Sequence, residues 1–222
     1  MIKNKTIRFV HKYISFFISL QLLLWTVSGI YFSFNKIENV RGEQYVLPIK
    51  AKEFNINPPD LKQASEAVNY FYRLDQIIYS IKNSNGIRYY DQDHRPVKKI
   101  SFDQAKQIVN LRTTLKALSV SLVNSSSSGS EYRGRQLPLY KVSAKSESNS
   151  IINVYVDPYS GNISLIRSNQ WRLWDFLWGL HIMDWIERDN IDNYFLKFFS
   201  ILALISSISG IILFFKVKKK SF

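Results

Sequence analysis

The chain has 222 residues, with 30 Lys and Arg against 17 Asp and Glu, a formal net charge of +13, three histidines and no cysteine. The missing cysteine excludes disulfides, thiolate metal sites and redox thiols. The basic residues form no stripe with interleaved aromatic residues, so nucleic acid is not expected as a partner.

Two apolar segments predict membrane-spanning helices. Residues 13–34 contain no charged residue, and neither do residues 198–215, which residues 194–197 can extend outward. A hydrocarbon core of roughly 30 Å needs about 20 apolar residues per helix. The first apolar run is too long for a cleaved signal peptide, and no small-x-small cleavage site follows it. We therefore expect two spans, at 13–34 and 193–215.

The distribution of charge predicts the orientation of the spans. Every Asp and Glu lies between them. The charged residues of the outer flanks are all basic: Lys3, Lys5, Arg8, Lys12, Lys216, Lys218, Lys219 and Lys220. Basic flanks face the cytoplasm and meet anionic lipid. We expect cytoplasmic termini, at 1–12 and 216–222, and a central domain at 35–170 on the far side of the membrane.

The central segment has the pattern of an antiparallel α+β domain. A helix is expected to start at Pro58-Pro59-Asp60, with Leu61, Ala64, Val68 and Phe71 at helical spacing. Strands are expected at "QIIYSIK" and "IRYYDQDHRPVKKI", joined by a turn at 83–86. A second helix, "SFDQAKQIV", and the strands "LPLYKVSA" and "VYVDPYSGNISLI" follow. This order suggests two repeated halves.

No catalytic residue is assigned from motifs. The "DQDH" stretch, with Asp91, Asp93 and His94, lacks the rest of a calcium-binding loop and is better explained as a turn. The sequence also has no phosphate-binding glycine loop and no nucleophile elbow. Whether the chain is an enzyme stays open.

Residues 171–192 predict an amphipathic helix at the membrane interface. Trp171, Trp174, Trp178, His181 and Trp185 are spaced so that one helix would place all five on a single stripe. Tryptophan favours the membrane interface. His181 is therefore expected to point with the tryptophans, toward lipid headgroups or a partner.

Both spans contain Ser-Gly-Ile and further small residues, which allow helices to approach closely in lipid. In antiparallel spans Gly29 lies near the outer end and Gly210 near the inner end, so they cannot pack on each other within one chain. Plain helix packing, a homodimer contact and room for a flat cofactor are the alternatives. The candidate packing residues are Gly29, Ser33, Ala203, Ser206, Ser207 and Gly210.

His11 and His181 are the candidate metal ligands. A neutral imidazole is a good axial ligand for haem iron. His11 precedes the first span and His181 the second, so one chain is not expected to place both on one haem. In a symmetric dimer each could meet its twin, giving an inner and an outer haem. The alternative is that both are interface residues bonded to water or headgroups.

The sequence resembles the family of PepSY-associated transmembrane proteins. The segment "IRFVHKYISFFISLQLLLWTVSGIYFSF" has the Arg-x-x-His opening and the "LWTxSG" core of their first helix. "LPLYKVSA" with "VYVDPYSGNI" resembles the PepSY strand pair, and "WDFLWGLHIMDW" with "SISGIILFF" resembles the closing helix pair. The resemblance runs from about residue 7 to 216 and is weakest over 50–135.

The resemblance implies an inner-membrane protein linked to iron or siderophore uptake. Some larger relatives resemble haem-containing ferric-siderophore reductases, so we expect b-type haem as a possible cofactor, with His11 and His181 as ligands. Arg8 and Arg172 are candidate partners of haem propionates. With two spans, a complete haem site needs a homodimer or another membrane subunit. The alternative is an accessory module whose outer domain binds a peptide, a peptidase or a transporter.

Overall fold

The computed structural model describes residues 4–48 and 67–218. The chain forms two compact units. The first consists of 1–36 and 173–222, and the second of 37–172. The predicted helix start at 58–60, with Leu61 and Ala64, lies outside the described residues, as do Lys3, Lys219 and Lys220.

Two long apolar helices dominate the first unit. Helix α1 runs from Asn4 to Phe34 and α5 from Tyr194 to Lys218. Both are long and apolar enough to cross a membrane, over Lys5–Phe34 and Tyr194–Lys216, in agreement with the two predicted spans. Because α1 begins at Asn4, His11 lies inside this helix and not ahead of it.

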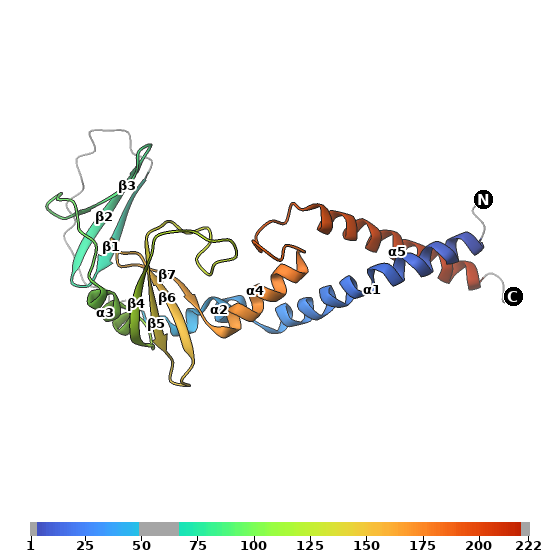
Figure 1. The fold of residues 1–222 in the computed structure, drawn as a ribbon, viewed down its shortest axis with the longest axis horizontal. Helices are drawn as coiled ribbons and strands as arrows, with labels where there is room; N and C mark the ends of the chain where they lie inside the picture. The colour runs from blue at the N-terminus through green and yellow to red at the C-terminus, as the bar shows by residue number, and fades with distance from the viewer. Residues whose placement is uncertain (1–3, 49–66, 219–222) are drawn as a thin grey trace. The chain divides into compact units, whose positions relative to one another are not determined.

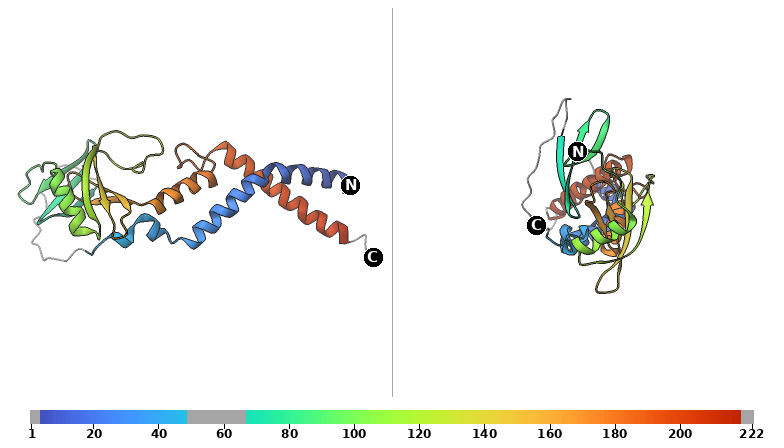
Figure 2. Two further views of the ribbon diagram at one scale, coloured as in Figure 1. Left: turned by 60° about the horizontal axis from the view of Figure 1, so that its bottom comes forward. Right: turned by 90° about the vertical axis from the view of Figure 1, so that its left-hand side faces the viewer.

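The two helices lie side by side and cross, as Figures 1 and 2 show. The rings of Phe17 and Phe199 stack with centroids 5.7 Å apart. The hydroxyls of Ser15 and Ser206 are 2.7 Å apart. Ile18 is only 1% exposed. The first half of α1 therefore packs on α5.

Helix α4 runs from Asn169 to His181, so the helix predicted for 171–192 is wrong after His181. It ends in a Schellman motif: Met183 has φ 57°, the N–H of Asp184 donates to Gly179 O (3.0 Å), and that of Met183 to Leu180 O (3.4 Å). The Asp184 carboxylate then accepts four N–H groups of the following loop, from Ile186, Glu187, Asp189 and Asn190. These bonds hold the loop in turns.

The second unit contains two antiparallel sheets. Three strands, β1 (Ala67–Arg73), β2 (Gln76–Asn83) and β3 (Gly86–Asp91), form one sheet. Four strands, β4 (Lys116–Val123), β5 (Leu139–Lys145), β6 (Ile151–Val156) and β7 (Ile163–Arg167), form the other in sequence order. Short helical turns at Ile37–Arg41 (α2) and Glu43–Tyr45 precede them. The predicted α+β class is confirmed.

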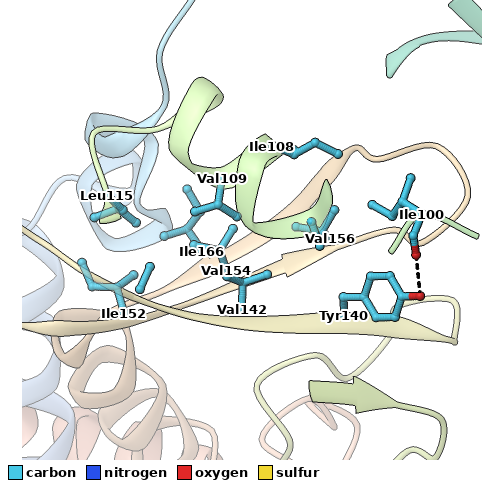
Figure 3. Close-up of a cluster of buried hydrophobic side chains, with 12 residues drawn as sticks. Ile100, Ile108, Val109, Leu115, Tyr140, Val142, Ile152, Val154, Val156 and Ile166 are labelled. Atoms are coloured by element: carbon cyan, nitrogen blue, oxygen red, sulfur yellow. Dashed lines mark hydrogen bonds between the residues drawn. The ribbon is translucent and has the colours of Figure 1, made fainter. Parts of the chain in front are cut away.

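Helix α3, from Phe102 to Arg112, covers one face of the four-stranded sheet (Figure 3). Ser101 caps its first turn in a reciprocal capping box with Gln104. Ile108 and Val109 pack into the core, and the Tyr140 hydroxyl donates to Ile100 O at 2.8 Å. The sheet contributes Val142, Ala144, Ile152, Val154, Val156 and Ile166.

One predicted helix is wrong where the structure describes it. Val68 and Phe71 belong to strand β1, which pairs with β2 along its whole length. The segment "AVNYFYR" is rich in β-branched and aromatic residues, which favour a strand. Two repeated halves are not confirmed, since the described sheets have three and four strands. The turn at 83–86 and the strand pair at 151–167 are confirmed.

Candidate histidine sites

His181, the last residue of α4, is held by α1 in three ways. Its Nδ1 lies 2.6 Å from Ser28 Oγ. Its carbonyl accepts the Trp25 indole N–H at 2.6 Å, and the Leu180 carbonyl accepts Gln21 Nε2 at 3.3 Å. The last carbonyls of a helix lack partners within it. One face of α1 therefore caps α4 and fixes its terminal histidine.

Aromatic rings surround the His181 imidazole. Trp178 lies parallel to it, with centroids 6.3 Å apart and 5° between the planes, and Phe32 of α1 meets it edge-on at 5.6 Å. Trp174 stacks on Trp178. His181 thus points with these tryptophans, as predicted, but the stripe packs toward α1. Burial lowers the pKa of His181, so the ring is neutral near pH 7.

His11 lies between α1 and α5. Its Nδ1 is 2.9 Å from Ser209 Oγ and 3.2 Å from Ser206 O, and Ser15 Oγ lies 3.4 Å away. Gly210 lies against the ring: a Cβ atom at this position would be 3.1 Å from His11 Cε1. The ring therefore occupies space that the glycine leaves.

Each Ser-Gly-Ile motif provides the serine that contacts one histidine. Ser28 meets His181, and Ser209 meets His11. Sequence reasoning found both motifs and both histidines but did not pair them. It missed Gln21 and Trp25 as well; a glutamine seven residues before a serine in an apolar helix was the available signal.

The two histidine sites are far apart, as the sequence predicted. His11 and Ser28 are seventeen positions apart on α1, which is about 25 Å along the helix axis. One haem cannot take both imidazoles as ligands within a chain.

The other predicted residues are divided between the two units. Arg8 is exposed on α1, one turn before His11. Arg172 is bound in the second unit, with Nε 2.6 Å from Glu131 Oε1 and Nη1 2.6 Å from Asn169 Oδ1. Trp171 also lies there, with the Arg167 guanidinium 4.2 Å from its ring centroid. Trp185 follows the end of α4.

The small residues of α5 and α1 differ in what they contact. Ser206 and Gly210 face His11. Ser207 and Ser33 are exposed, and their hydroxyls donate to carbonyls of their own helices, Ala203 O and Ile30 O. A Cβ at Gly29 would have no atom within 4 Å.

Among the described residues, neither histidine belongs to a cluster of metal-binding side chains. Over residues 4–48 and 67–218, no group of three or more His, Cys, Asp or Glu side chains could hold a metal ion. An axial ligand needs only a neutral imidazole whose other ring nitrogen is held by a hydrogen bond. Both His11 and His181 have a hydrogen-bond partner at Nδ1.

A pocket of about 430 Å³ lies in the second unit. Its walls come from strand β3, the 96–97 and 136–138 segments, and the turn after β6. The rings of Tyr89 and Tyr159 stack there with centroids 5.3 Å apart, and Arg88, Gln136 and Asp157 add polar groups. The volume is in the range of small-ligand sites.

A model of one protein family, described as the PepSY-associated TM region, matches residues 10–222. No curated protein gives a significant match, and no solved structure does.

Proposed function

Because the chain belongs to the PepSY-associated TM region family, we propose that this membrane protein carries electrons through b-type haem bound at His11 and His181, in iron- or siderophore-linked reduction. Bound haem would supply one-electron chemistry at each level of the membrane. The proposed location is a bacterial inner membrane, with both termini in the cytoplasm and the 37–172 unit on the opposite side.

The observation that carries this proposal is the matched pair of histidine sites. Each ring contacts a serine hydroxyl through Nδ1, at 2.6 Å for His181 and 2.9 Å for His11. Histidines that bind metals usually donate the N–H of their second ring nitrogen to a hydrogen-bond acceptor, which fixes the orientation of the ring. The stacked Trp178 and the edge-on Phe32 keep water away from one side of His181.

One chain offers one imidazole at each level, so six-coordinate haem requires a second source of ligands. We propose a homodimer, or a complex with another membrane subunit, in which equivalent histidines face each other. Arg8, exposed and one turn from His11, is the proposed partner of a propionate. Arg172 is already paired with Glu131, which disfavours the same role for it.

The test is spectroscopic. The protein is produced with an ample haem supply and purified in mild detergent, and oxidised and dithionite-reduced absorption spectra are recorded. A Soret band with sharp reduced α and β bands, lost in His11→Ala or His181→Ala, supports the proposal.

His94→Ala is the matched control, because His94 bonds to Tyr79 in the other unit (2.7 Å). A wild-type protein without a Soret band, or a band that survives both His11→Ala and His181→Ala, would refute the haem role.

The pocket between Tyr89, Tyr159 and Gln136 favours a second candidate function, an accessory module that binds a peptide or a transporter segment. Arg88 lines it, and exposed Lys98, Lys99 and Arg135 adjoin its lining residues in sequence, so an acidic segment is the expected ligand. The Asp157 carboxylate is largely taken up by its own turn, through Tyr159 N, Ser160 N and Ser160 Oγ.

A fluorescent acidic peptide containing proline and tyrosine tests this candidate by anisotropy, with a lysine-for-glutamate version of the peptide as its control. Arg88→Glu should weaken binding, whereas Lys116→Glu on strand β4, which lines no part of the pocket, should not. Equal binding of both peptides would argue against it.

A further inference from the structure

We infer that Ser28 and Ser209 are positioning residues that hold His181 and His11 in the tautomer with the proton on Nδ1. Nε2 is then the nitrogen that offers a lone pair at both sites. The purpose of this arrangement rests on the proposed function, but the tautomer can be measured without haem.

For His181 the argument starts from the single hydroxyl proton of Ser28. Ser28 Oγ lies 2.7 Å from Leu24 O, one turn back on α1, and 2.6 Å from His181 Nδ1. A carbonyl oxygen can only accept, so the serine proton must go to Leu24 O. If the proton pointed to Nδ1 instead, Ser28 Oγ and Leu24 O would lie 2.7 Å apart with no hydrogen between them. The serine oxygen therefore accepts, and Nδ1 of His181 must carry the proton.

For His11 two contacts lead to the same result. Ser209 Oγ lies 2.8 Å from Ser206 O, which uses the hydroxyl proton of Ser209. The serine oxygen is then the acceptor for His11 Nδ1 at 2.9 Å. Ser206 O also lies 3.2 Å from the same Nδ1, and a carbonyl can face it only if this nitrogen is protonated.

In both sites a backbone carbonyl takes the serine hydroxyl proton, so the serine oxygen must accept a hydrogen bond from the imidazole. A hydroxyl fixed by its own helix has no freedom to donate to the ring. The other ring nitrogen, Nε2, has no hydrogen-bond partner among the residues that the structure describes. A metal-binding imidazole needs this state, a bare nitrogen on one side and a fixed N–H on the other.

The experiment is nitrogen-15 NMR of ring-labelled histidine in the full chain, purified without haem, in lipid bilayers above the pH at which histidine titrates. The chain has three histidines, so the spectrum contains three pairs of ring nitrogens. We expect a protonated, pyrrole-type Nδ1 and a bare, pyridine-type Nε2 for His11 and His181.

Substitutions assign the cause. Ser28→Ala should move the two ring resonances of His181 toward each other, as the tautomers mix, and leave those of His11 unchanged. Ser209→Ala removes the nearer acceptor of His11 Nδ1 but leaves the Ser206 carbonyl beside it, so it should shift the His11 resonances less than Ser28→Ala shifts those of His181, and leave the His181 resonances unchanged. Ser28→Thr keeps the hydroxyl and should restore the wild-type pattern, which separates positioning from a general structural role.

A protonated Nε2 at either histidine in the wild-type protein would overturn the inference for that site. So would a Ser28→Ala spectrum identical to wild type. The outcomes separate from those of the haem test: a protein with the expected tautomers but no Soret band keeps this inference and loses the proposed function. Haem binding by a protein with protonated Nε2 would do the opposite.

Discussion

Gly210 makes room for the imidazole of His11. A Cβ at position 210 would stand 3.1 Å from Cε1 and 3.7 Å from Nε2 of that ring. The glycine of the second Ser-Gly-Ile motif therefore leaves space for the histidine, and the serine before it binds the same ring. The motif in α5 serves one side chain of α1.

Gly210→Ala should displace the His11 ring and destabilise the α1–α5 pair. Overpacking costs about 1–3 kcal/mol, which exceeds the gain of about 1 kcal/mol expected from alanine in a helix. The measurement is the unfolding temperature in detergent, followed by tryptophan fluorescence. Gly29→Ala is the matched control, because open space surrounds that position; it should leave the temperature unchanged or raise it. Equal losses in both variants would contradict the packing described for His11.

Asp175→Ala should loosen the loop after α4. The Asp175 carboxylate is 1% exposed and lies 2.7 Å from Arg188 Nη1. The Arg188 side chain is 31% exposed, so the expected cost is that of losing a hydrogen bond between charged groups, about 2 kcal/mol. Asp192→Ala removes an exposed pair with Lys197 and should have no measurable effect. Hydrogen exchange over residues 182–193 is measured for both variants. Similar exchange rates would show that the Asp175–Arg188 pair does not hold the loop.

Glu131→Gln should lower the stability of the second unit at pH 7. Burial alone would raise the pKa of Glu131, but hydrogen bonds from Asn153, Arg172 and Tyr155 outweigh it and hold the pKa below its usual value. The carboxylate stabilises the fold above the ordinary glutamate pKa of about 4.3, and this contribution is lost as the pH falls through the lower folded pKa.

The expected loss for Glu131→Gln is about 2 kcal/mol. Thermal unfolding by circular dichroism at pH 7 and near pH 3 gives the comparison, and the difference from wild type should shrink at the acid end. Glu147→Gln, on the exposed β5–β6 hairpin, is the control and should behave as wild type at both values.

Ser101→Ala should fray the start of α3. It removes the acceptor for Gln104 N (3.1 Å) and one half of the capping box, at a cost of about 1 kcal/mol. Faster hydrogen exchange at Gln104 and Ala105 is the expected result. Ser119→Ala, on an exposed position of β4, should leave these amides unchanged, and protection in both variants would show that the cap is not needed.

Much of the fold could be predicted because local chemistry agrees with tertiary structure there. The two apolar runs, the cap at Ser101 and the turn at Asp157 each carry their own signal. The strand at 67–73 was predicted as a helix because its apolar residues fit the spacing of a helix as well as the alternation of a strand. The end of α4 could not be predicted because the left-handed position that follows the helix, which is usually glycine, is Met183. The hydrogen bonds of Asp184 to the following loop help to hold this conformation.

The histidine sites could be predicted only in part. Their residues were found because the chain has only three histidines and no cysteine. The pairing of Ser28 with His181 joins residues 153 positions apart, and that of Ser209 with His11 joins residues 198 positions apart. No local pattern in one sequence encodes such distances.

The contacts between α1 and the end of α4 have a consequence for biosynthesis. This helix leaves the ribosome early, with Gln21, Trp25 and Ser28 on one face, yet their partners at Leu180 and His181 are made some 150 residues later. Until then Gln21 and Trp25 lack their final acceptors, and Ser28 lacks the donor that His181 supplies. Nascent chains that stop before α4 would leave these polar groups facing lipid without their partners, which is costly. The polar face of α1 is therefore satisfied only after α4 has been made and packed against it.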